Sequence, residues 1–65
     1  MVSINGVQKA GYEEKTLSDV LAAETYHVNQ IAVEINGEIV SKSLYTETVV
    51  HSGDCIEVVS FVGGG

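Results

Sequence analysis

The 65-residue chain carries nine acidic residues against three lysines and no arginine, which gives a formal net charge of -6. This balance argues against nucleic acid and anionic membrane surfaces as partners, and it fits a basic partner protein better. The alternative is that the acidic charge only keeps a small protein soluble. Because a chain of this length has room for one domain and little for an enclosed catalytic cleft, function is expected on the surface or at an end.

The cysteine and histidine content limits the chemistry further. Cys55 is the only cysteine, so no intramolecular disulfide can form, and His27 and His51 are too few for a four-ligand zinc site. Residues 1–15 contain no basic start followed by an apolar run, and no stretch is long and apolar enough to predict a membrane span. A free thiol without an export signal predicts a reducing compartment, most simply the cytoplasm.

A hairpin is expected at the start of the chain. Val2 and Ile4 alternate with polar residues, and Asn5-Gly6 suits the positive φ angles of a tight turn that returns through residues 7–10.

A short helix is expected next. Thr16 is a good N-cap, and Asp19 places a negative charge in the first turn. Apolar side chains at spacings of three and four then form one stripe of a helix that ends near Thr25; they are Leu17, Val20 and Leu21.

The second half of the chain predicts three more strands. Residues 31–35 alternate between apolar side chains and Ala32 or Glu34, and a second Asn-Gly turn at Asn36-Gly37 leads to a strand at 39–40. Residues 55–62 form the final strand, after a turn at 52–54. The resulting order of two strands, a helix and three strands predicts an α+β fold, with one helix against one mixed sheet.

The segment 41–50 shows neither the hydrophobic periodicity of a helix nor that of a strand. It is interpreted as a loop with one short turn, pinned by Leu44, Tyr45 and Val49.

The last strand predicts where partners dock. Alternation puts Ile56, Val58 and Val62 on one face and Cys55, Glu57, Val59 and Phe61 on the other. Since Glu57 marks the second face as exposed, Val59 and Phe61 are expected to form an exposed apolar patch for partner docking. The alternative is that strand twist or the irregular loop covers them.

Three glycines, Gly63, Gly64 and Gly65, follow this strand. Residues without Cβ at a chain end neither pack a core nor strengthen a strand, but three extended residues reach about 10 Å into a narrow channel. We therefore expect a domain at 1–62 followed by a flexible glycine tail at 63–65. The alternative is a frayed end or a leftover linker.

These residues together resemble the ThiS family, the sulfur carriers of thiamine biosynthesis. The resemblance covers nearly the whole chain, and departures from the family pattern occur at Ser41-Lys42 and at Tyr45, where a tryptophan is frequent. The matching segments are Asn5-Gly6, Thr16-Leu17, Asn36-Gly37-Glu38-Ile39-Val40, Thr48-Val49-Val50, Gly53-Asp54, Ile56-Glu57-Val58-Val59 and the end from Phe61 to Gly65.

The resemblance implies a fold and a mechanism. The fold is a ubiquitin-like β-grasp, with one short helix packed on a mixed four- to five-stranded sheet. An adenylyltransferase is expected to use ATP to adenylate Gly65, while Gly63 and Gly64 thread its active site. Sulfur from a sulfur-donating enzyme then gives a thiocarboxylate, which supplies a thiazole synthase. The chain itself is expected to be a protein cosubstrate rather than an enzyme, with no bound cofactor.

Other functions remain open at this stage. The small subunit of molybdopterin synthase and protein-conjugating ubiquitin-like modifiers use a similar tail, and a passive β-grasp interaction module has an idle one. A cysteine redox enzyme that uses Cys55 with His51 and Asp54 is the remaining alternative, although a cysteine at a strand start is usually a packing residue.

Overall fold

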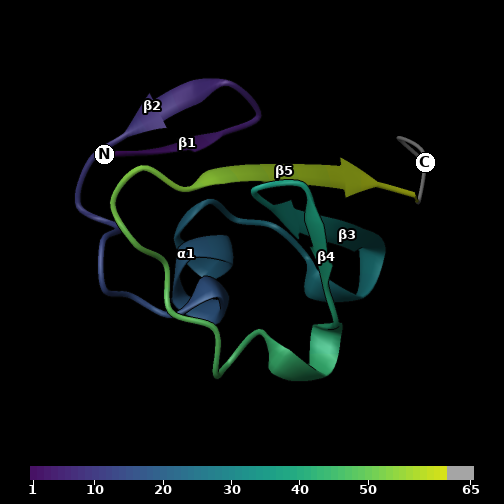
Figure 1. The fold of residues 1–65 in the computed structure, drawn as a ribbon. Coiled ribbons are helices and arrows are strands. Elements are labelled where there is room, and N and C mark those ends of the chain that lie inside the picture. The colour runs from purple at the N-terminus through teal and green to yellow at the C-terminus, as the bar shows by residue number, and fades with distance from the viewer. Residues whose placement is uncertain (62–65) are drawn as a thin grey trace.

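The computed structural model describes residues 1–61, which form one mixed five-stranded sheet with a single α-helix on one side (Figure 1). The elements in chain order are β1 (Val2–Ile4), β2 (Val7–Lys9), α1 (Leu17–Ala23), the 3-10 helix η1 (Val28–Gln30), β3 (Ile31–Ile35), β4 (Glu38–Val40), the 3-10 helix η2 (Lys42–Leu44) and β5 (Cys55–Ser60). The strand order is β2-β1-β5-β3-β4, and only β1 and β5 run parallel. The predicted α+β arrangement is confirmed.

Both Asn-Gly dipeptides form the expected hairpin turns. The φ angles are 50° and 83° at Asn5 and Gly6, and 53° and 86° at Asn36 and Gly37. Two consecutive positive φ angles match the right-handed twist of the flanking strands, and asparagine and glycine adopt them at low cost. Each hairpin therefore follows from its own dipeptide.

The helix begins as predicted. The Oγ1 atom of Thr16 accepts a hydrogen bond of 3.1 Å from the backbone N–H of Asp19, which satisfies one of the free amides of the first turn. The helix ends at Ala23, slightly before the predicted end, and the chain turns at Thr25 with a φ of 64°.

One core fills the space between α1 and the inner face of the sheet. The predicted helix stripe is fully buried there, together with side chains from β1, β3 and β5 and from the segment that precedes β5. The buried residues are Val2, Ile4, Leu17, Val20, Leu21, Ile31, Val33, Tyr45, Val50, Ile56 and Val58. Across residues 1–61, no helix has both the length and the apolar character needed to cross a membrane.

The prediction for segment 41–50 was partly wrong. Tyr45 is buried, but Leu44 and Val49 are 47% and 39% exposed, and Val50 is the second buried residue. The reason is backbone pairing near the start of α1. The N–H of Val50 donates to the carbonyl of Lys15 at 2.8 Å, and this pairing turns Val50 inward and its neighbour Val49 outward.

Candidate functional site: the outer face of β5

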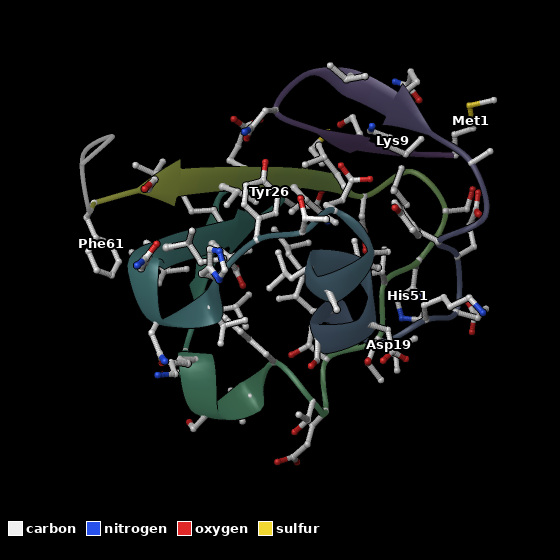
Figure 2. The ribbon with its side chains drawn as sticks, turned by 180° about the vertical axis from the view of Figure 1, so that it is seen from behind. Met1, Lys9, Asp19, Tyr26, His51 and Phe61 are labelled. Carbon is white, nitrogen blue, oxygen red and sulfur yellow. The ribbon has the colours of Figure 1, made fainter. Side chains whose placement is uncertain are left out.

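β5 separates an inner apolar face from an outer face that carries two large apolar side chains. Ile56 and Val58 are buried, whereas Val59 and Phe61 are 62% and 63% exposed. The predicted exposure of Val59 and Phe61 is confirmed. Figure 2 shows Phe61 at the end of β5, on the opposite side of the molecule from His51.

Neighbouring strands extend this exposed surface. Val59 lies directly opposite Ala32 on β3, and on the far side of β3 Glu34 lies opposite Ile39 on β4. Residues directly opposite in an antiparallel pair point to the same face. Ala32, Ile39, Val59 and Phe61 therefore share one face, which we call the outer patch; Ile39 is 79% exposed.

The outer patch is acidic at its centre. Glu57 and Glu34 lie directly opposite each other on β5 and β3, and both side chains are exposed. Glu57 lies next to Val59 on the same face of β5, and Glu34 lies opposite Ile39 of β4. The surface thus combines apolar area with negative charge.

Hydrogen bonds from both hairpin turns hold β5 along its length. At its start, the Oδ1 of Asn36 accepts from the N–H of Cys55 at 2.9 Å, and the Nδ2 of Asn36 donates to Asp54. At its middle, the Asn5 side chain bonds both main-chain groups of Val58. Just after its end, the N–H of Phe61 donates to the carbonyl of Gln30 at 3.1 Å. The strand that carries the outer patch is therefore fixed from both sides.

The predicted tail lies outside the described residues. Gly63, Gly64 and Gly65, together with the predicted inward position of Val62 and the domain boundary at residue 62, therefore stay predictions. Phe61 is the last residue that the structure describes, and it adjoins this segment directly.

Cys55 does not pack in the core, contrary to the packing role expected for it. It is exposed on the outer face, opposite Ser3 of β1. The His51 ring lies 3.1 Å from a carboxylate oxygen of Glu14. The carboxylate of Asp54 accepts from the backbone N–H of His51 and from the Asn36 side chain. Both candidate partners of the thiol are thus engaged with other groups, and the arrangement gives no support to a cysteine redox enzyme.

A surface groove of about 460 Å³ lies between β4 with its hairpin turn and the segment that precedes β5. Its lining includes Asn36, His51 and Asp54, and also Ile39 of the outer patch. Neither Val59 nor Phe61 lines this groove, so we do not assign the site to it. Within residues 1–61, no three histidine, cysteine or acidic side chains gather as metal ligands would.

The resolved pKa shifts lie away from the outer patch. A hydrogen bond from the Tyr12 hydroxyl to Glu24, at 2.6 Å, raises the pKa of Tyr12, and burial raises the pKa of Tyr45. The N-terminal ammonium 2.9 Å away lowers the pKa of Glu13. Perturbed groups often mark catalytic sites, but these shifts arise from structural contacts. The outer patch therefore fits recognition better than acid–base chemistry.

Sequence reasoning missed three features of this site. It identified Asn5 and Asn36 as turn residues but not as side chains that bond β5, and it did not pair Glu34 with Glu57. A signal for the Asn5 and Asn36 bonds was present in the sequence, because an asparagine side chain offers both a donor and an acceptor. No local pattern shows which strand receives those bonds, since this depends on strand order.

Comparisons with known proteins agree with the geometry. The family model described as the ThiS family matches residues 2–65. The sulfur carrier protein ThiS of Bacillus subtilis is 38% identical over 66 residues and is matched over 100% of both chains. The crystal structure of the thiamine biosynthesis protein ThiS from Geobacter metallireducens superposes with a TM-score of 0.79 at 30% identity, covering 98% of this chain and 97% of that one.

A further relative is much longer. The thiazole synthase of Paramagnetospirillum magneticum is 39% identical over 62 residues, which make up 95% of this chain but only 19% of that protein. This chain thus spans about one fifth of that relative. The full-length family match and the shared five-stranded architecture confirm the ubiquitin-like β-grasp fold, and this chain belongs to the ThiS family of sulfur carrier proteins.

Proposed function

We propose that this chain carries sulfur for thiazole formation in thiamine biosynthesis, as a thiocarboxylate on Gly65. The observation that carries the proposal is a family match that runs through residue 65. The exposed apolar residues Val59 and Phe61 shortly precede the glycine segment in the sequence, which supports it. The protein then acts as a cosubstrate, and its partners supply the catalysis.

The chemistry begins with activation, because a carboxylate is a poor electrophile. An adenylyltransferase would bind ATP, and the Gly65 carboxylate would attack the α-phosphorus and displace pyrophosphate. A sulfur nucleophile at the oxidation level of sulfide, delivered by a sulfur-donating enzyme, then attacks the acyl carbon. AMP leaves, and a C-terminal thiocarboxylate remains. In this scheme Gly63 and Gly64 let the backbone enter a narrow active site without obstruction by side chains.

Recognition is assigned to the outer patch, with Val59 and Phe61 as the docking residues beside the tail. Large exposed apolar side chains in one patch usually mark a binding surface, and aromatic residues contribute strongly to such interfaces. The exposed fractions of 62% and 63% support this assignment.

A thiazole synthase is proposed as the acceptor of the sulfur. In the Paramagnetospirillum protein, a segment similar to this chain is part of a polypeptide named thiazole synthase. A shared polypeptide holds carrier and synthase at high effective concentration, which supports their working together as separate chains here. We also propose a cytoplasmic location, where the exposed thiol of Cys55 would stay reduced.

The test is to locate the sulfur. The protein is incubated with ATP, an adenylyltransferase of this pathway and a sulfide source, and the peptides are weighed by mass spectrometry. The proposal requires sulfur on the C-terminal peptide, retained after thiol reduction, because a reductant removes a cysteine persulfide but not a thiocarboxylate. The modification should persist in Cys55→Ser and vanish when Gly65 is deleted. Sulfur found only on the Cys55 peptide would reject the mechanism.

A further inference from the structure

Asn5, in the turn between β1 and β2, lies where the pairing of β1 with β5 ends. β1 ends at Ile4, whose register partner on β5 is Ile56. The last main-chain bond of this parallel ladder runs from the N–H of Asn5 to the carbonyl of Ile56, at 2.9 Å. The chain then turns away at Asn5-Gly6, while β5 continues to Ser60.

Without a further partner, the main-chain N–H and C=O of Val58 would have no hydrogen bonds at this point. Toward β3, main-chain bonds are made by Cys55, whose carbonyl accepts from Asn36, and by Phe61. Hydrogen-bonding directions alternate along a strand, so the N–H and C=O of Val58 point the other way, past the end of β1. The Val58 side chain is only 7% exposed, and unpaired main-chain groups in such a place are costly.

The Asn5 carboxamide supplies both missing bonds. Its Oδ1 accepts from the N–H of Val58 at 2.7 Å, and its Nδ2 donates to the carbonyl of Val58 at 3.2 Å. The side chain thus imitates the next residue of a paired strand. An aspartate of the same shape would keep only the first bond, because an ionised carboxylate has no donor.

We infer that Asn5 is a positioning residue for the sulfur-carrying tail. It holds the edge of β5 that faces away from β3, one residue before the outer patch begins at Val59, and so fixes the part of the strand that leads to Phe61, the last described residue before the tail. This inference rests on the proposed function, since this position matters only if Gly65 must enter a partner's active site. A misplacement of about 1 Å is enough to cost a large factor in rate at a reacting group.

The inference separates Asn5 from the docking residues. Val59 and Phe61 are held on the β3 side, through the register with Ala32 and the bond to Gln30. Loss of the Asn5 side chain should therefore leave docking, and with it the KM of the adenylyltransferase for the carrier, nearly unchanged. The turnover number should fall, because the carboxylate is delivered less accurately.

The test uses Asn5→Gly, which permits the positive φ that the turn requires and removes the whole side chain, including the carboxamide. The matched control is Asn36→Gly, which makes the same change in the other Asn-Gly turn and frees the start of β5 instead. Adenylation of each carrier is followed by pyrophosphate exchange, and hydrogen exchange is measured at the amide of Val58. Asn5→Asp is the second variant; it keeps the acceptor and loses the donor.

The expected result is a fall in kcat of about tenfold for Asn5→Gly, with KM changed by less than about threefold and faster exchange at Val58. Asn5→Asp should lose about threefold in kcat, and it carries the test if Asn5→Gly does not fold. Asn36→Gly should stay within about twofold of the parent chain.

Equal losses for the two glycine variants, a loss confined to KM, or unchanged exchange at Val58 would overturn the inference. If the parent chain is adenylated and both Asn5 variants match it, only the positioning role fails. If the parent chain is not adenylated at all, the proposed function fails instead.

Discussion

Glu34 on β3 and Glu57 on β5 lie directly opposite each other on the exposed face of the sheet, in one register pair of the central antiparallel ladder. Like charges in this position repel, and the arrangement costs stability in the free protein. An acidic pair beside exposed apolar side chains suits a partner surface that carries basic residues. Stability and recognition therefore make opposite demands at this position.

Removing one of the two charges should stabilise the free protein. For Glu57→Gln, the free energy of unfolding is expected to rise by up to about 1 kcal/mol, because the cross-strand repulsion disappears. Glu47→Gln, at an exposed position outside the sheet, makes the same charge change and is the control. Urea denaturation measures both. A destabilised Glu57→Gln would show that Glu57 makes a favourable contact in the free protein.

Association with the adenylyltransferase should depend on salt. Raising the ionic strength from about 0.01 M to about 0.15 M shortens the Debye length from about 30 Å to about 8 Å, which screens the steering of a chain with net charge -6. The association rate constant from stopped-flow mixing should fall accordingly, and it should fall less steeply for Glu57→Gln than for the parent. A rate constant that does not respond to salt would remove steering from the account.

Phe61→Asp should weaken binding to the adenylyltransferase by at least about tenfold, since an aromatic anchor in the outer patch is replaced by a charge. Its stability should change by no more than about 0.5 kcal/mol, because Phe61 is 63% exposed. Leu44→Asp introduces the same charge at another exposed apolar residue, away from β5, and should bind normally. Titration calorimetry measures the binding affinity of each variant, and thermal melts measure its stability. Equal binding by the two variants would move the docking surface elsewhere.

Leu21→Ala should destabilise the protein by about 2–5 kcal/mol, because it leaves a cavity under α1 where Leu21 is fully buried. For a small domain this approaches the whole free energy of unfolding, which is about 5–15 kcal/mol in typical proteins. Leu44→Ala is the control and should change stability by less than about 0.5 kcal/mol. Similar losses for both would mean that Leu44 contributes to the core despite its exposure.

Stability should decline at alkaline pH because of Tyr12. The hydrogen bond from its hydroxyl to Glu24 raises the pKa of Tyr12 in the folded state above its ordinary value of 10.0. The folded protein thus holds this proton more tightly than the unfolded chain does. The contribution is complete below pH 10 and is lost as pH rises through the folded pKa.

Tyr12→Phe should therefore be less stable than the parent at neutral pH, and the difference should shrink above pH 10. Urea midpoints between pH 7 and pH 11 measure this. Burial raises the pKa of Tyr45 in the same direction, so a part of the alkaline decline should remain in Tyr12→Phe and disappear only with Tyr45→Phe as well. A constant difference between Tyr12→Phe and the parent across this range would contradict the assignment.

Much of the fold was predictable because its signals are local. The Asn-Gly pairs form hairpin turns through their own φ preferences, and Thr16 caps α1 through a bond to Asp19, three residues away. Alternation along β5 placed Val59 and Phe61 on the exposed face, because side chains in a strand point to opposite faces in turn. The family resemblance rested on these same segments.

The tertiary structure alone decided the features that depend on strand order and register. Asn5 and Val58 are 53 residues apart in sequence, and they meet only because β1 and β5 pair in parallel. The opposition of Glu34 and Glu57 depends on the register of β3 with β5. In segment 41–50, which has no clear hydrophobic periodicity, backbone pairing places Val50 in the core and leaves Val49 exposed. Sequence patterns record how a residue suits its own element, whereas these relationships depend on how distant elements are placed against one another.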